Sequence, residues 1–295
     1  MRPGRPDDLP AVLELWRDDV RAGRRDCVPG DVHLRRVIAG FDWEARSRVV
    51  ESATGGLGGA VLVSNRATPL GTIAAVEASV APGRPMLLHD LTRWGLGLSR
   101  AAGAVAAQVW RGRGHCDGLQ GLGMKIARPW WRMDRSLSTA LPEPSPVAEY
   151  QLQDRGVVPA GAWAEVHNLA FVDHWRFSPR TEDELIGDLA APSLMAVTPG
   201  GSPAALTVCR IETYGADLRP QPVGIISSVG TLPDHRRRGL ATWLVAEALR
   251  RLRRAGARHA SLYVDGLNPT RAFDAYSKLG FELAFETEVW EATFP

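Results

Sequence analysis

The sequence predicts two related α/β domains that meet near the middle of the chain. Three observations support this: strand and helix patterns alternate through the second half, the first half repeats their order, and a proline-rich segment separates the two. That segment, "LPEPSPVAEY" at 141–150, has three prolines among its first six residues and no apolar period, which is typical of an extended linker. A chain of 295 residues is long enough for two domains.

The second half begins with helices. A helix over 159–172 is followed by a short helix that starts at Thr181, where Glu184 completes a capping box. Strands are then expected at 193–198, 204–212 and 222–230.

A glycine precedes the next predicted helix, which covers 239–255. The residues after Gly239 repeat apolar side chains every four positions on one face, and the pattern ends near Gly256. The elements that follow are a strand at 259–265, a helix with Asn268 as N-cap, Pro269 at its first position and Gly280 as its stop, and a last strand at 281–291.

The first half shows the same order with weaker signals. We expect a helix over 9–20, strands at 59–64 and 70–78, a helix over 86–101, a strand at 104–110, a short helix, and a strand at 122–133. "LGMK" at 122–125 corresponds to "LGFE" at 279–282, and Gly103 corresponds to Gly256. The expected domains are therefore 1–140 and 150–295, joined by a linker at 141–149.

Composition excludes several classes of protein. The formal net charge of +2 gives no field that favours nucleic acid or a membrane surface as partner. Cys27, Cys116 and Cys209 are widely spaced, so neither a metal site nor a disulfide framework is expected. The N-terminus does not resemble a signal peptide, and no stretch is apolar enough to span a membrane. We expect a cytoplasmic protein, either monomer or homodimer.

Three consecutive arginines pose a problem for the helix that follows Gly239. The buried strand "VGIISSVG" (223–230) leads into "TLPDHRRRGLAT" (231–242), so the arginines lie at a helix N-terminus, which disfavours cations. A bound polyanion resolves the conflict, because helix N-terminal N–H groups and guanidinium groups both bind phosphate. The alternative is a solvated basic turn. The basic run at 250–258 lies at a helix C-terminus, where the dipole favours it, so it is a weak argument for nucleic acid.

Two motifs carry a resemblance to a known family. "RRRGLA" (236–241) resembles the pyrophosphate loop of the GNAT N-acetyltransferase superfamily, and "NPTRAFDAYSKLGFE" (268–282) resembles its second signature. "HNLAFVDHWRFSP" (167–179) is similar to a segment of the tandem-domain group that includes mycothiol synthase. The resemblance implies two tandem domains, each a mixed, mostly antiparallel twisted sheet flanked by helices. It also implies transfer of an acetyl group from acetyl-CoA to the amine of a small molecule, without a metal.

The resemblance assigns the donor site to the second domain. It implies that the backbone of Val229, Gly230 and Thr231 pairs with the pantetheine arm, and that Asn268, Ala272 and Phe273 lie along the arm. Backbone N–H groups would hold the pyrophosphate and the arginines would neutralise it; the residues of this loop are Arg236, Arg237, Arg238, Gly239, Leu240, Ala241 and Thr242.

The catalytic residues are assigned less completely. The resemblance implies Tyr276 as the acid for the leaving thiolate, with a core aromatic as the alternative reading. The family can carry a glutamate base on the fourth strand, but Ile225 stands there. Asp173, His174 and, through a water, Ser227 or Ser228 are the candidate substitutes. The missing carboxylate also leaves open a non-catalytic acyl-CoA sensor or interaction protein.

The first domain lacks the pyrophosphate loop. "APGRPMLL" (81–88) replaces it, and the Gly103–Gly256 correspondence puts Met86 where Gly239 stands. We therefore expect a degenerate domain that does not catalyse, with a structural or substrate-shaping role.

Overall fold

The computed structural model describes the whole chain apart from residues 31–33, 35–37, 54, 117, 188, 191, 215–218, 220 and 269–271. The chain divides into two compact units. Unit 1 comprises Met1–Trp130, Tyr214–Leu218 and Phe285–Pro295, and unit 2 comprises Trp131–Thr213 and Arg219–Ala284.

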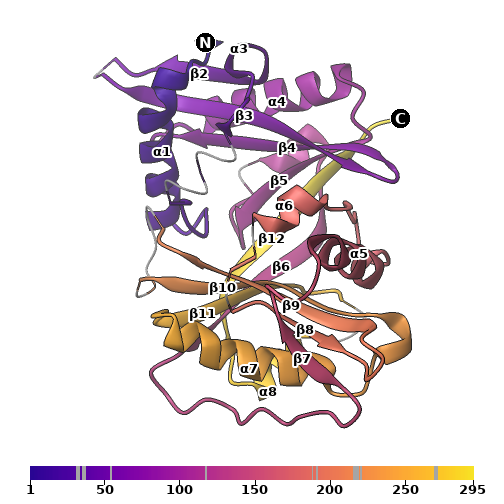
Figure 1. Ribbon diagram of the computed structural model, residues 1–295. Coiled ribbons are helices and arrows are strands. Elements are labelled where there is room, and N and C mark those ends of the chain that lie inside the picture. The colour runs from indigo at the N-terminus through magenta and orange to yellow at the C-terminus, as the bar shows by residue number, and fades with distance from the viewer. Residues whose placement is uncertain are drawn as a thin grey trace. The chain divides into compact units, whose positions relative to one another are not determined.

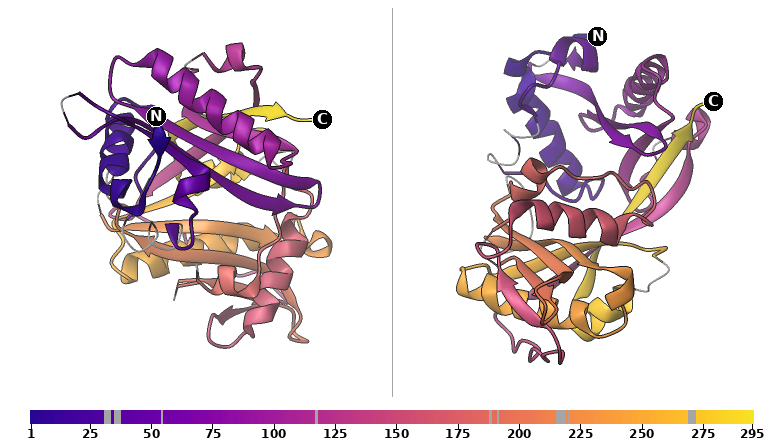
Figure 2. Two further views of the ribbon diagram at one scale, coloured as in Figure 1. Left: turned by 90° about the horizontal axis from the view of Figure 1, so that it is seen from above. Right: turned by 45° about the vertical axis from the view of Figure 1, so that its right-hand side comes forward.

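Unit 1 is built on a mixed sheet with the strand order β1-β2-β3-β4-β5-β12. All of its pairs are antiparallel except β4–β5, which is parallel. The strands are β1 (Arg2–Pro3), β2 (Ser47–Glu51), β3 (Leu57–Thr68), β4 (Gly71–Val80), β5 (Ala106–Gly112) and β12 (Glu282–Thr293). Helices α1 (Leu9–Arg21) and α4 (Pro85–Ala101) cover opposite faces of β3 and β4 (Figure 2). The described part of unit 1 also contains three short helices: η1 (Pro6–Asp8), α3 (Trp43–Arg46) and η2 (Leu119–Leu122).

Unit 2 repeats this arrangement with the strand order β6-β11-β10-β9-β8-β7. Its strands are β6 (Lys125–Ser136), β7 (Gln151–Asp154), β8 (Leu194–Val197), β9 (Pro203–Glu212), β10 (Val223–Thr231) and β11 (His259–Asp265). Its helices are α5 (Ala160–Phe171), α6 (Glu182–Ile186), η3 (Pro233–His235), α7 (Leu240–Arg254) and α8 (Ala272–Lys278). Helix α5 lies on one face of the sheet, and α7 and α8 lie on the other (Figure 1).

The predicted fold class is confirmed, and local signals explain most of the elements. Leu240, Leu244, Ala248 and Leu252 form the buried face of α7, as their spacing predicts. The capping box at α6 is present: Glu184 N donates to Thr181 Oγ1 at 3.3 Å, and Thr181 N donates to Glu184 Oε2 at 2.8 Å. Strands β1, β2 and β7 and helix α3 were not predicted; each is five residues or shorter, which is too short for an apolar period to reveal it.

Strands β6 and β12 are each divided between the two units. The strand predicted at 281–291 was placed in the second half, yet its part from Phe285 onward belongs to unit 1, where Val289 pairs with Trp110 of β5. The strand predicted at 122–133 divides at Trp130, and its later part belongs to unit 2. A period-two pattern says which side chains face inward, but it does not say which neighbouring strand provides the partner.

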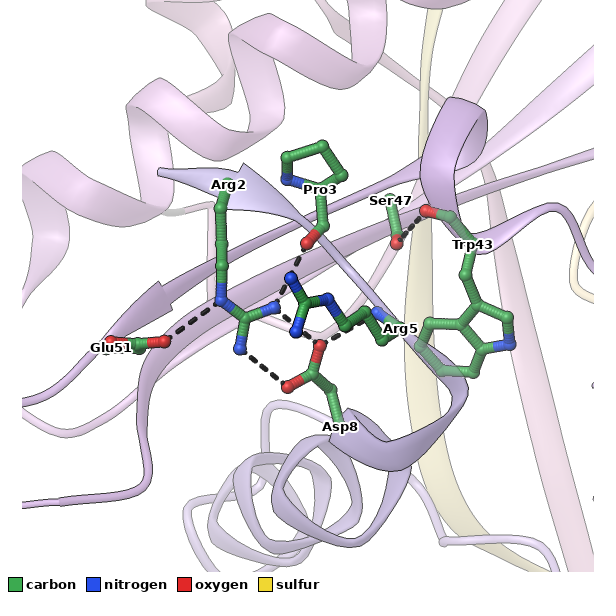
Figure 3. Close-up of polar contacts among 7 residues, drawn as sticks. All are labelled: Arg2, Pro3, Arg5, Asp8, Trp43, Ser47 and Glu51. Atoms are coloured by element: carbon green, nitrogen blue, oxygen red, sulfur yellow. Dashed lines mark hydrogen bonds and ion pairs between the residues drawn. The ribbon is translucent and has the colours of Figure 1, made fainter.

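The N-terminal edge of unit 1 is held by ion pairs. The Arg2 guanidinium donates to both oxygens of Asp8, at 2.8 and 2.9 Å, and to Glu51 at 2.9 Å (Figure 3). These bonds hold the pKa of Asp8 below its usual value. They join the short strand β1 to the start of α1 and to the end of β2.

Candidate active site

Strand β10 separates from β11 before it ends. The parallel pairing with β11 covers residues 223–226, whereas the antiparallel pairing with β9 continues to Thr231, with a register shift between Ile226 and Ser228. In the part of the chain that the structure describes, residues 228–231 therefore pair with β9 alone, and Ser227 lies at the register shift. Their other edge can accept an extended ligand through backbone hydrogen bonds.

Residues 227–231 form the end of β10, here called the β10 tip, and alternate residues of it face the two sides of the sheet. Val229 packs with the apolar cluster under α7, to which Ala272, Phe273 and Tyr276 of α8 also belong. Ser228 and Gly230 pair with Val208 and Leu206, which pack against α5. A ligand along the tip thus meets α8 on one side and α5 on the other.

The loop between β10 and α7 has the backbone of an anion site. Gly239 is the N-cap of α7 with φ 87°, and Arg237 has φ 62°, which is uncommon for a residue other than glycine. Left-handed residues in such a turn direct successive N–H groups toward one point, and the α7 dipole adds to their attraction for an anion. Leu240 is buried, while Ala241 is half-buried and Thr242 is exposed in the first turn.

The three arginines lie in two different environments. Arg237 and Arg238 are exposed, and the single bond found for the Arg238 guanidinium among the described residues is a long one, 3.4 Å, to Asp234 O. Arg236 is half-buried, and its guanidinium donates to Thr231 O and to Ala170 O at 3.2 Å each. The sequence grouped all three as neutralising charges, so this difference is visible only in the structure.

The proline-rich segment lies against this loop. Glu143 forms an ion pair with Arg250 of α7 at 2.7 Å. The Tyr150 hydroxyl lies 2.8 Å from His235 Nδ1. Val147 packs with Leu240 and Trp243. The segment predicted as a linker therefore also packs against α7 and the loop that precedes it.

Helix α8 supplies the residues of the second motif. The ring of Phe273 packs edge-on against Trp131 with centroids 5.2 Å apart, and Tyr276 packs against Phe281. Burial raises the pKa of Tyr276 to about 12, and no bond of its hydroxyl is found among the described residues. Asn268 N donates to Asp265 O at 3.0 Å. Pro269, expected at the first helical position, lies outside the described residues.

The end of α5 packs directly on the β10 tip. A Cβ on Gly230 would lie 2.9 Å from both Ala170 Cβ and Phe171 Cε2, so only glycine allows this contact. The Phe171 ring stacks on His167 at 4.7 Å and meets His174 edge-on at 4.6 Å. Phe171 was not predicted as a site residue; its signal was its place in "HNLAF", directly before the candidate Asp173 and His174.

Burial and charges of both signs act on the pKa of His174. Burial holds its pKa below the ordinary value, Asp265 and Asp173 oppose this shift, and Arg236 adds to it. Asp173 Oδ2 lies 3.9 Å from Arg236 Nη1, and the carboxylate is mostly exposed. Asp265, at the end of β11, is a further residue that sequence reasoning missed.

The remaining base candidates lie within the sheet. Ser228 is buried on the face that α5 covers, and Ser227 Oγ donates to Val208 O at 3.2 Å. Ile225 is buried and pairs with Arg210 and Ser261, so the strand offers no carboxylate there. Within the described ranges no cluster of three metal-ligating side chains occurs, and no helix is long and apolar enough to cross a membrane.

Known proteins share both the fold and part of the sequence. Residues 210–290 match the family described as FR47-like protein. A mycothiol acetyltransferase of Nocardia farcinica is 31% identical over 229 residues, which is 75% of this chain and 69% of that protein. A mycothiol acetyltransferase of Salinispora arenicola is 29% identical over 94% of this chain and 90% of its own length. One from Thermobispora bispora is 32% identical, with 56% of its length matched.

Solved structures extend the likeness of fold to nearly the whole chain. A GCN5-related N-acetyltransferase from Sphaerobacter thermophilus has a TM-score of 0.78 at 23% identity, covering 99% of this chain and 94% of that one. A tandem GNAT protein from the clavulanic acid biosynthesis pathway has a TM-score of 0.69 at 18% identity, covering 100% and 98%. Together with the sequence relatives, they show that the chain belongs to the GNAT superfamily of N-acetyltransferases, as a tandem-domain member related to the mycothiol acetyltransferases.

Proposed function

We propose that the chain transfers an acetyl group from acetyl-CoA to the amine of a small molecule, and that unit 2 performs the reaction. The observation that carries this proposal is the β10 tip, which leaves β11 after Ile226 and leads into the loop that ends at Gly239. An exposed strand edge followed by a helix N-terminus suits a ligand with an extended arm and a diphosphate.

The donor is bound mainly by backbone groups. The edge of Val229, Gly230 and Thr231 that faces away from β9 pairs with the pantetheine arm, although the carbonyl of Thr231 also accepts from Arg236 Nε. N–H groups from Arg237 to Thr242 hold the pyrophosphate. The exposed guanidinium groups of Arg237 and Arg238 supply positive charge beside it. Asn268, Ala272 and Phe273 border the arm on the α8 side.

Tyr276 is the proposed general acid. The amine nitrogen attacks the thioester carbonyl, the C–S bond breaks, and the departing thiolate takes the hydroxyl proton. A pKa of about 12 keeps that proton in place at neutral pH. A backbone N–H of Val229 or Gly230 stabilises the oxyanion.

His174 is the proposed general base, and it takes the place of the carboxylate missing at Ile225. Its contact with Phe171, which packs on Gly230, puts the imidazole on the α5 side of the β10 tip. Its lowered pKa keeps it neutral and able to accept the amine proton. Asp173 acts from the same turn through the charge of its carboxylate, and Ser228 with a water is the alternative route for the proton.

The test is release of CoA thiol from acetyl-CoA across a panel of small primary amines. We expect turnover with at least one amine, and kcat/KM should fall as pH drops through the lowered pKa of His174, because protonation removes the base. Tyr276→Phe should lower kcat about 100-fold. Its matched control is Tyr263→Phe, a partly exposed tyrosine of β11 with no proposed role, which should keep wild-type turnover.

Two results would contradict the proposal. If acetyl-CoA binds but no amine gives turnover, the chain is an acyl-CoA sensor rather than an enzyme. If acetyl-CoA does not bind, the donor assignment fails as well.

A further inference from the structure

Arg236 makes contacts that a pyrophosphate ligand does not need. Its Nε donates to Thr231 O, the last residue of β10, and its Nη2 donates to Ala170 O, in the last turn of α5. Its Nη1 lies 3.9 Å from the Asp173 carboxylate. All three of the guanidinium nitrogens are therefore directed at unit 2 itself.

Both carbonyl contacts are favourable for a cation. The carbonyls in the last turn of a helix have no intrahelical partner and carry partial negative charge, and Ala170 O is one of them. Thr231 O stands where β10 ends and the loop begins. A single side chain thus joins the end of the donor strand to the end of α5.

The segment held in this way contains the proposed base. His174 N donates to Phe171 O at 2.9 Å, and the two rings are in edge contact. The Phe171 ring in turn packs on Gly230 of β10. Arg236 and Phe171 therefore fix the α5 end by two separate contacts, one polar and one apolar.

We infer that Arg236 is a positioning residue, which holds the turn bearing His174 against the tip of β10, rather than a ligand of the pyrophosphate. This inference rests on the proposed function. It divides the arginine triplet by role: Arg237 and Arg238 face the donor, and Arg236 connects the donor strand to the acceptor side.

The charge of Arg236 gives the inference a distinctive readout. Three charged groups act on the pKa of His174: Asp265 of β11 and Asp173 of its own turn raise it, and Arg236 of the loop lowers it. Arg236 is the cation among them, so its removal raises the pKa of His174 and moves the acid limb of kcat/KM to higher pH. A residue that only supports the fold does not produce this shift.

The experiment compares Arg236→Gln, Arg236→Lys and Arg238→Gln. Arg238→Gln should weaken acetyl-CoA binding, measured by calorimetry, roughly tenfold, because one charge-assisted bond is lost, with no shift in the pH profile. Arg236→Gln should keep acetyl-CoA binding, lower kcat at least tenfold and shift the acid limb upward. Arg236→Lys keeps the charge but not the planar fork, so kcat should fall while the acid limb stays near its wild-type position.

Hydrogen exchange of the backbone amides at 168–176 provides a readout that needs no turnover. Exchange there should become faster in Arg236→Gln and stay unchanged in Arg238→Gln. Equal loss of acetyl-CoA affinity in the two glutamine variants, with unchanged exchange, would overturn the inference. If exchange is faster in Arg236→Gln but the protein acetylates no amine, the positioning role of Arg236 is retained and only the proposed function is rejected.

Discussion

The two units share a topology but differ at the turn after the central strand. In each unit one parallel pair, β4–β5 or β10–β11, stands among antiparallel strands, and a helix connects its two members. The turn before that helix has four residues in unit 1 (81–84) and eight in unit 2 (232–239). The longer turn provides the left-handed Arg237 and Gly239. The shorter one has one left-handed residue, Gly83 with φ 79°, and leads from Arg84 straight into Pro85, which has no N–H group to offer.

This turn also corrects the expectation for Met86. Helix α4 begins at Pro85, so Arg84 holds the N-cap position that Gly239 holds in α7, and Met86 lies exposed in the first turn. The helix correspondence fixed at Gly103 and Gly256 does not extend to the other end, because α4 is two residues longer than α7: 17 against 15. The two turns therefore differ in length, and Met86 is not the counterpart of Gly239.

The strands that precede the two turns, β10 and β4, also differ in the regularity of their pairing. Strand β10 has a register shift at Ser227, whereas β4 pairs with β3 without interruption from Gly71 to Val80. Unit 1 does carry a carboxylate on its strand, Glu77, but Arg25 binds it through two nitrogens at 3.0 Å each. The comparison shows that the fold alone does not make a site: a loop and a bulge in one strand distinguish the unit with the proposed donor site.

The largest expected effect tests whether the turn alone decides donor binding. The double variant Gly239→Trp with Arg237→Glu should weaken acetyl-CoA binding by about 100-fold or more, since it removes the left-handed glycine and reverses a charge. The matched variant in unit 1, Gly83→Trp with Arg84→Glu, should leave binding unchanged. Calorimetry measures both and should find one acetyl-CoA per wild-type chain; two per chain would show that unit 1 also has a donor site.

The sequence predicts much of unit 2 because its signals are local. The apolar face of α7, the capping box of α6 and the strand before the arginines all depend on residues within a few positions of one another. Family resemblance then assigns the loop as a whole. The individual roles within it are not local: Ala170 O lies 66 residues from Arg236 in the sequence, and no pattern in "RRRG" distinguishes the first arginine from the other two.

The division of β6 and β12 between the units is the other feature that the sequence does not reveal. "LGMK" and "LGFE" lead into β6 and β12 with a similar pattern, which does not indicate the sheet that each strand joins. The choice between edges depends on contacts far apart in the chain, such as those between β12 and β5.

A smaller effect is expected where α5 packs on the strand. Gly230→Ala puts a methyl group 2.9 Å from Ala170 and Phe171, so the end of α5 must move away from β10. We expect unfolding to become easier by about 1–3 kcal/mol and kcat to fall roughly tenfold or more through the displaced His174. Gly224→Ala is the control, because it meets Leu252 of α7 at 2.7 Å on the other face of the same strand. Gly224→Ala should destabilise the protein to a similar extent without lowering kcat. Equal kcat values in the two variants would show that the position of the α5 end does not affect catalysis.

The smallest effect is expected at the matching contact in unit 1. There Ser79 of β4 faces α1, and its hydroxyl donates to Asp19 at 2.6 Å, where unit 2 has glycine against an aromatic ring. Asp19 is buried, and Arg24 Nε also donates to it at 2.7 Å. Ser79→Ala should therefore lower the free energy of unfolding by about 1–2 kcal/mol, while acetyl-CoA affinity and kcat stay unchanged. Ser99→Ala, which removes only a bond to Gly95 O within α4, should cost less than about 1 kcal/mol. A loss of turnover in Ser79→Ala without loss of stability would mean that the contact between Ser79 and Asp19 contributes to the reaction. It would contradict the proposal that unit 2 alone performs the reaction.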